Sequence, residues 1–214
     1  FDRDGFIDLW LTQNMVPNTS DILQDTLFRG LGNGEFENVT LDSGLQTRGW
    51  TDLDDLNNGE AHTRAWGSAA CDLNGDGIPE LMSPSYGRSP NHLWQGERDD
   101  RGNVTFVNRS VDSGYAFDEN QSWEDNQFAA CYCDSNPTAE GCDAVDPPMV
   151  MCSGENWNHD IDRQPFRLGG NSASTFCADI DNDGDIDLMS GEIRHWWAGE
   201  GSDGSELLIN DGMA

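Results

Sequence analysis

Lysine is absent from this 214-residue chain, whose 11 basic residues are all arginines and stand against 40 acidic residues. The formal net charge is −29. Because proteins bind nucleic acids and anionic membranes through cationic side chains, this balance excludes a general affinity for either surface. Long apolar runs are also missing, and a membrane-spanning helix needs roughly 20 apolar residues, so the sequence predicts no direct membrane insertion.

Paired C-x-x-C motifs are missing too, which argues against a zinc site or a redox motif. The six cysteines are Cys71, Cys131, Cys133, Cys142, Cys152 and Cys177. Their even number favours an oxidised protein in an extracellular, cell-surface or periplasmic location. A nested pairing of Cys131–Cys152 with Cys133–Cys142 is one of three possible connectivities for the clustered four. Cys71 and Cys177 either bridge neighbouring repeats or are small buried hydrophobic residues.

A nine-residue acidic pattern occurs in full at 72–80 and 179–187, and in shortened form at 2–8. Both full copies have oxygen-bearing side chains at positions 1, 3, 5 and 9, a glycine at position 6 and a leucine directly after. Alternating carboxylates around a tight glycine turn converge on one point, and hard oxygen ligands suit Ca²⁺. In the shortened copy position 1 would precede Phe1, so we expect the chain to be a piece of a longer protein.

The EF-hand is the main alternative, since its loop also alternates oxygen ligands around a glycine. That loop needs a bidentate glutamate at position 12, where this chain has Leu11, Ser83 and Ser190. The segments after the acidic patterns are short and interrupted by proline or glycine, so they predict strands and not the helices of an EF-hand.

A second element repeats after each acidic pattern. The segments 27–45 and 93–115 correspond, and 207–212 begins the same element again. With the small-residue strands expected at 67–71 and 174–178, each unit contains four short strands, including an outer one at 104–107. Four antiparallel strands in a repeat of tens of residues are typical of a β-propeller blade.

The spacing of the repeats locates an insertion. Asp8 and Glu80 are 72 residues apart, whereas Glu80 and Asp187 are 107 apart. The excess coincides with a cysteine- and proline-rich stretch at 116–170. We expect it to be an excursion from a blade that disulfides stabilise, because a short segment cannot build a core of its own.

The segments 72–81, 179–188 and 2–9 resemble the calcium-binding repeats of the FG-GAP/VCBS family, found in integrin α-subunits and secreted bacterial proteins. The element at 32–40 with Gly44-Leu45 is similar to the bacterial ASPIC/UnbV-associated branch. The resemblance implies an all-β propeller, typically of seven blades of four-stranded antiparallel sheets. Residues 1–214 would then be a partial propeller of about three repeats, cut within a repeat at both ends.

The resemblance also implies structural Ca²⁺ at two complete sites and one partial site. The metal ligands that it implies are Asp72, Asn74, Asp76 and Glu80 with the Ile78 carbonyl; Asp179, Asp181, Asp183 and Asp187 with the Asp185 carbonyl; and Asp2, Asp4 and Asp8 with the Phe6 carbonyl.

The family implies no reaction, and none of the four histidines lies in a nucleophile motif, so we expect no enzyme. The expected function is an extracellular calcium-binding module for adhesion, scaffolding or protein–protein assembly, with a protein or glycan partner at the cell surface or in the extracellular space. The alternatives are a carbohydrate-binding or accessory propeller domain of a secreted enzyme, or a subunit of a larger surface complex.

Two further segments have competing interpretations. His195-Trp196-Trp197 either stacks on a sugar or forms a core between blades, and we favour the core. The acidic segment 52–60 imitates the metal pattern, but a register with glycine at position 6 puts Leu56 at position 3. We expect it to be a solvated turn.

Overall fold

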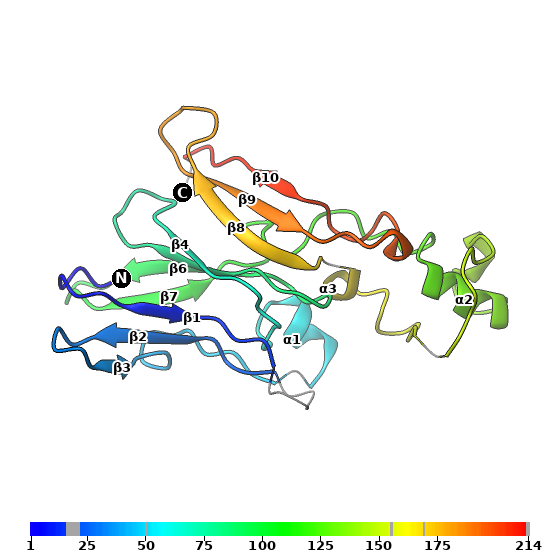
Figure 1. Cartoon of the computed structure of the whole chain (residues 1–214), viewed down its shortest axis with the longest axis horizontal. Coiled ribbons are helices and arrows are strands. Elements are labelled where there is room, and N and C mark those ends of the chain that lie inside the picture. Colours follow the sequence, from blue (N-terminus) through cyan, green and yellow to red (C-terminus); the bar gives the residue numbers. More distant parts are fainter. Residues whose placement is uncertain (16–21, 50, 155, 169, 213–214) are drawn as a thin grey trace.

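The computed structural model describes residues 1–15, 22–49, 51–154, 156–168 and 170–212, and its strands form three small antiparallel sheets (Figure 1). The first sheet contains β1 (Leu9–Leu11), β2 (Thr26–Gly30) and β3 (Phe36–Asn38). The second contains β4 (Ala69–Cys71), β5 (Glu80–Ser83), β6 (His92–Arg98) and β7 (Val104–Asn108). The third contains β8 (Ser172–Ala178), β9 (Asp187–Glu192) and β10 (Glu206–Leu208).

The helices are few and short: α1 (Leu53–Asn57), α2 (Gln127–Ser135), α3 (Pro165–Leu168), and the 3₁₀ turns η1 (Cys142–Ala144) and η2 (Trp196–Ala198). In the described part of the chain, none of them has the length and apolar character that crossing a bilayer requires. Because strands in three sheets dominate the described elements and the helices are short, the all-β class expected from the sequence is confirmed.

The sequence repeats coincide with equivalent strand pairs. The leucine that follows each acidic pattern pairs with the next strand in the same register, as Leu81 with Trp94 and Leu188 with Leu208. Leu9 likewise pairs with Phe28 in the first sheet. The second sheet is a four-stranded meander in the order β4-β5-β6-β7. In the described residues the first sheet has no equivalent of β4 and the third none of β7.

The second sheet lies between the other two and buries both of its faces. Toward the first sheet, Leu81 and Trp94 pack with Leu27, and Trp10 packs against this cluster. All four residues of β5 are buried, as expected for a strand covered on both sides. The burial of successive residues on β5 is therefore due to a neighbour on each face.

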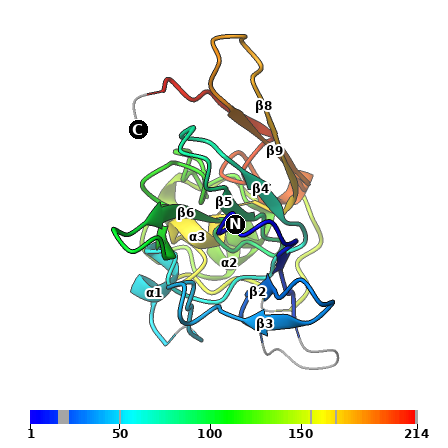
Figure 2. The same cartoon turned by 90° about the vertical axis from the view of Figure 1, so that its left-hand side faces the viewer.

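The opposite face of the second sheet packs on the third sheet. Met82 and Leu93 form a buried cluster there with Leu188 and Tyr115, and Leu208 packs against it. Figure 2 shows the resulting fan, with the third sheet at the top, the second in the middle and the first at the bottom.

The three sheets stack head to tail. The leucine after each acidic pattern faces the preceding sheet, as Leu81 and Leu188 do, and the next residue faces the following sheet, as Trp10 and Met82 do. The same rule leaves one apolar row uncovered on the third sheet, where Phe176, Met189 and Leu207 are 58%, 43% and 48% exposed. Register places these three side chains next to one another.

All six cysteines form disulfides. Cys71–Cys177 joins β4 to β8, and the nested pairs Cys131–Cys152 and Cys133–Cys142 lie in the insertion. The nested connectivity confirms the expectation for the clustered four. For Cys71 and Cys177, of the two possibilities left open by the sequence, the bridge is the one that forms.

The insertion projects from the end of the stack opposite to the acidic loops (Figure 1). Aromatic side chains fill its interior, where the ring of His159 stacks on Tyr132 and meets Trp123 edge-on. The ring nitrogens of His159 are hydrogen-bonded to Trp157 Nε1 at 3.2 Å and to the Glu140 carbonyl at 2.7 Å. This histidine is therefore a buried core residue.

Two expectations were wrong. The segment 52–60 contains helix α1, capped by Asp52, and buries Asp55 and Leu56, because Leu56 belongs to a small apolar cluster with Ala61. It is not a solvated turn. Trp196 lies on η2 with 69% of its surface exposed, so it does not form a core between sheets.

Candidate metal centre

Three acidic loops lie at one end of the stack (Figures 1 and 2), and we name them the first loop (2–8), the second loop (72–80) and the third loop (179–187). The second loop joins β4 to β5 and the third joins β8 to β9, while the first precedes β1. Strands therefore flank the loops, as the sequence predicted, and the helices of an EF-hand are not there.

The three loops share one internal hydrogen-bond frame. The side chain at position 3 accepts from the backbone N–H of position 5, at 3.0 Å in the first two loops and 3.2 Å in the third. The side chain at position 5 accepts from the N–H of position 7 at 2.7–3.0 Å. With the accepting side chain given first and the donating backbone N–H second, the pairs are Asp2–Asp4 and Asp4–Phe6 in the first loop, Asn74–Asp76 and Asp76–Ile78 in the second, and Asp181–Asp183 and Asp183–Asp185 in the third.

The position 9 carboxylate anchors each loop to its sheet. Glu80 accepts from Leu73 N and Asp187 from Ile180 N, both at 2.7 Å. Asp8 accepts from the terminal ammonium of Phe1, at the equivalent position of the first loop. A second oxygen binds the neighbouring strand in two loops, since Asp187 accepts from Asn210 N at 2.9 Å and Asp8 from Gly30 N at 3.0 Å.

Two backbone positions of each loop are left-handed. The glycine at position 6 has φ of +91°, +82° and +105° in the three loops. Position 4 has φ of +66° at Arg3, +70° at Gly75 and +64° at Asn182. Glycine and asparagine are the residues that most readily adopt this conformation, so position 4 has a sequence signal in the two complete loops but none at Arg3.

The third loop brings three carboxylates together. Oxygens of Asp179, Asp181 and Asp187 lie within 4.8 Å of one another. Hydrogen bonds from Ile180 and Asn210 lower the pKa of the Asp187 carboxyl, so its charged form is favoured. Among the described residues this is the one group of three or more acidic, histidine or cysteine side chains close enough to hold a metal.

The second loop contains two buried oxygens without a partner, Asp72 Oδ1 and Glu80 Oε1. Glu80 is only 2% exposed, and burial raises its pKa. An unpaired buried carboxylate oxygen is costly, and a divalent cation would satisfy it. The carboxylates of the third loop therefore fit a hard cation that prefers oxygen ligands, whereas the second loop, which the structure describes in full, offers two buried oxygens and no such group.

The side chain at position 5, Asp183, does not belong to the group of three carboxylates in the third loop. One oxygen of Asp183 and one of Asp76 are hydrogen-bonded to the backbone at position 7. The expected first-loop ligands Asp2, Asp4 and Asp8, all within the described residues, do not form a comparable group of close carboxylates. The carbonyls of Phe6, Ile78 and Asp185 stay a prediction.

An arginine of the first loop lies across the second. Arg3 donates through Nε to the Gly77 carbonyl at 2.7 Å and through Nη2 to the Asp76 carbonyl at 3.0 Å. A side chain on Gly77 would occupy the place of the Arg3 guanidinium. Arg98 of β6 contacts the first loop in return, donating to the Asp2 carbonyl at 3.2 Å. These contacts were not predictable from the loop pattern.

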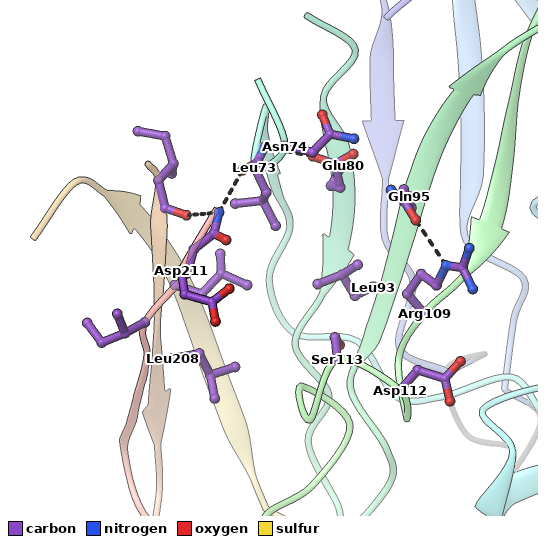
Figure 3. A pocket seen from close by; sticks show the side chains of 14 residues that line it. Leu73, Asn74, Glu80, Leu93, Gln95, Arg109, Asp112, Ser113, Leu208 and Asp211 are labelled. Carbon is purple, nitrogen blue, oxygen red and sulfur yellow. Dashed lines mark hydrogen bonds between the residues drawn. The ribbon is translucent and has the colours of Figure 1, made fainter. Parts of the chain in front are cut away.

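A cavity of about 480 Å³ separates the second and third loops. In Figure 3 Leu73, Asn74 and Glu80 lie on its second-loop side, with Leu208 of β10 and Asp211, which follows that strand, on the other side. Leu93 and Ser113 line its floor. The cavity therefore reaches Glu80 and Asn74, two of the expected ligands.

No protein-family model, no curated protein and no solved structure matches the chain.

Proposed function

We propose that this chain is part of an extracellular calcium-binding β-propeller of the FG-GAP/VCBS type, which serves adhesion, scaffolding or protein–protein assembly. The observation that carries the proposal is the common frame of the three loops, together with the converging carboxylates Asp179, Asp181 and Asp187. Clustered carboxylates repel one another unless a cation lies between them, so a structural metal accounts for the arrangement.

Calcium would supply the positive charge that neutralises each loop. In the third loop Asp179, Asp181 and Asp187 would hold it; in the second, Asp72, Asn74 and Glu80 would do so. Position 9 is the first residue of β5 and of β9, so the ion would fasten the start of a loop to the strand that leaves it. The role would be structural, because each of these loops closes an antiparallel strand pair, β4 with β5 or β8 with β9.

Head-to-tail stacking supports the propeller. Related sheets that use one face for the preceding neighbour and the other for the following neighbour form a series, which a propeller closes into a ring. Phe176, Met189 and Leu207 form an apolar row on the last face, which a further sheet of the same kind would cover.

The disulfides and the charge support the extracellular location. Three disulfides need an oxidising compartment, and millimolar extracellular calcium fills sites of moderate affinity. The insertion, which projects away from the loops, is the surface offered to a protein or glycan partner.

Calcium removal tests the proposal. A site filled at 100 times its Kd stabilises the fold by about 2.7 kcal/mol, which corresponds to a shift of roughly 5 °C or more for a protein of this size. We expect a chelator to lower the melting temperature by at least this much, and Asp181→Ala to remove part of the shift.

The control is Asp134→Ala, an exposed aspartate on α2 far from the loops. It should leave the calcium shift unchanged. A melting temperature that is the same with calcium and with chelator would count against the proposal.

A carbohydrate-binding role is the second candidate, because Trp196 is 69% exposed and His195 stacks on Trp197 at 5.1 Å nearby. Exposed tryptophan rings are suited to stacking on sugars. Binding of soluble glycans that Trp196→Ala abolishes would favour this role.

A further inference from the structure

A single side chain joins the second and third loops. Asn210, which follows β10, donates through Nδ2 to the Leu73 carbonyl at 2.7 Å and to the Ile186 carbonyl at 3.3 Å. Leu73 is position 2 of the second loop, and Ile186 is position 8 of the third. The amide is held in place by its oxygen, which accepts from Gly212 N at 3.1 Å.

The residues that this amide connects also hold the two position 9 carboxylates. Leu73 N donates to Glu80 Oε2 at 2.7 Å, and Asn210 N donates to Asp187 Oδ1 at 2.9 Å. A series of three hydrogen bonds therefore runs from Glu80 through Leu73 and Asn210 to Asp187. Ordering either carboxylate on a metal restrains the groups bonded to the other.

The equivalent positions in the other sheets show that the fold itself does not need this asparagine. By register, Asn210 corresponds to Gly96 in the second sheet and to Gly30 in the first. A Cβ on Gly96 would collide with the Ile78 side chain, and one on Gly30 with the Ile7 carbonyl. The amide bridge is therefore a feature of the interface between the second and third loops.

We infer that Asn210 is a positioning residue that couples the second and third metal sites, so that calcium in one loop raises the affinity of the other. The inference rests on the proposed function. Each loop must lose conformational freedom to bind, and a shared hydrogen-bond series lets the first ion order part of the second site. Such coupling is reciprocal by thermodynamic necessity.

A double-mutant cycle tests the coupling. Asn210→Gly removes the amide but keeps the backbone N–H, and glycine already occupies both equivalent positions. Asp179→Ala with Asp181→Ala disables the third loop. Calorimetric titration of the whole chain with calcium chloride then gives the affinity of the second loop in four proteins: with and without the third site, in each Asn210 background.

With Asn210 present, loss of the third site should weaken calcium binding to the second loop about fivefold or more. In the Asn210→Gly background the same loss should change it less than twofold. Asn33→Ala, which removes an exposed amide from the turn between β2 and β3, is the matched control and should keep the full effect.

The outcomes separate the coupling from the proposed function. Equal weakening in both backgrounds, or none in either while the second loop still binds calcium, overturns the coupling alone. Absence of calcium binding in all four proteins overturns the proposed function.

Hydrogen exchange provides a measurement that leaves Asn210 unchanged. In the protein whose third loop is disabled, calcium in the second loop should slow exchange of the Ile180 amide, which is bonded to Asp187. An unchanged exchange rate would also overturn the coupling.

Discussion

The bridge between Cys71 and Cys177 should be the largest single contributor to stability among the three disulfides. It links β4 to β8 across a sequence separation of 106 residues. The Cys131–Cys152 bridge lies inside that loop and shortens it by 21 residues. Loop-closure entropy then gives about 4.6 kcal/mol for the unfolded chain of this effective length.

The perturbation is the double variant Cys71→Ala with Cys177→Ala. Both cysteines are only partly buried where they pack against the cluster of Met82 and Leu188, so alanine removes little buried apolar surface. We expect the free energy of unfolding to fall by about 4 to 5 kcal/mol. At 2–4 °C per kcal/mol, the melting temperature should fall by roughly 10 °C or more.

The assay is urea unfolding followed by circular dichroism without reductant. The control is Cys133→Ala with Cys142→Ala, whose separation of 9 residues gives about 2.6 kcal/mol and lies within the insertion. A loss below about 1.5 kcal/mol for the Cys71 and Cys177 variant, or a larger loss for the control, would refute the reasoning.

Two further perturbations have signs that follow from local geometry. The Cβ of Gly184→Ala meets open space, so the variant is strained only by its positive φ, and we expect the free energy of unfolding to fall by about 1–2 kcal/mol. Gly77→Ala must also displace the Arg3 guanidinium, so its free energy of unfolding should fall further. Urea unfolding midpoints compare the stabilities of the two variants, and adding Arg3→Ala to both should reduce the difference between them. Equal losses of stability in Gly184→Ala and Gly77→Ala would contradict a role for the Arg3 contact. The pKa of Asp203 is raised from 3.8 to about 8, mainly by burial and further by the nearby charges of Asp118 and Glu192. The folded state therefore binds the carboxyl proton of Asp203 more tightly than the unfolded state does. The free energy of unfolding should therefore fall as pH rises from 3.8 to about 8, and Asp203→Asn should remove this loss, stabilising the protein at pH 8 by up to about 5 kcal/mol. Midpoints at pH 5 and pH 8 that change equally in the variant and the wild type would exclude Asp203 as the source.

Much of the fold was predictable because its signals are local. The strands after each acidic loop and the outer strand near 104–107 follow from repeat spacing and short-range patterns. The nested disulfides of the insertion were also predicted as one of three connectivities. The expectation of a solvated turn at 52–60 was wrong, because the burial of Leu56 against Ala61 depends on how the chain folds and not on the acidic composition of the segment.

The frame of each loop is likewise a property of the sequence, since its hydrogen bonds join residues two apart, as Asn74 with Asp76. The left-handed backbone at position 4 has a local signal in Gly75 and Asn182, but Arg3 gave none.

The sequence by itself determined where the acidic loops lie and which strands leave them, because those features depend on neighbours along the chain. Only the tertiary structure decided which faces are covered and how the loops touch. Arg3 reaches Gly77 across 74 residues, and Asn210 reaches Leu73 across 137. Contacts of that range form when sheets stack, and no periodicity in a single segment encodes them.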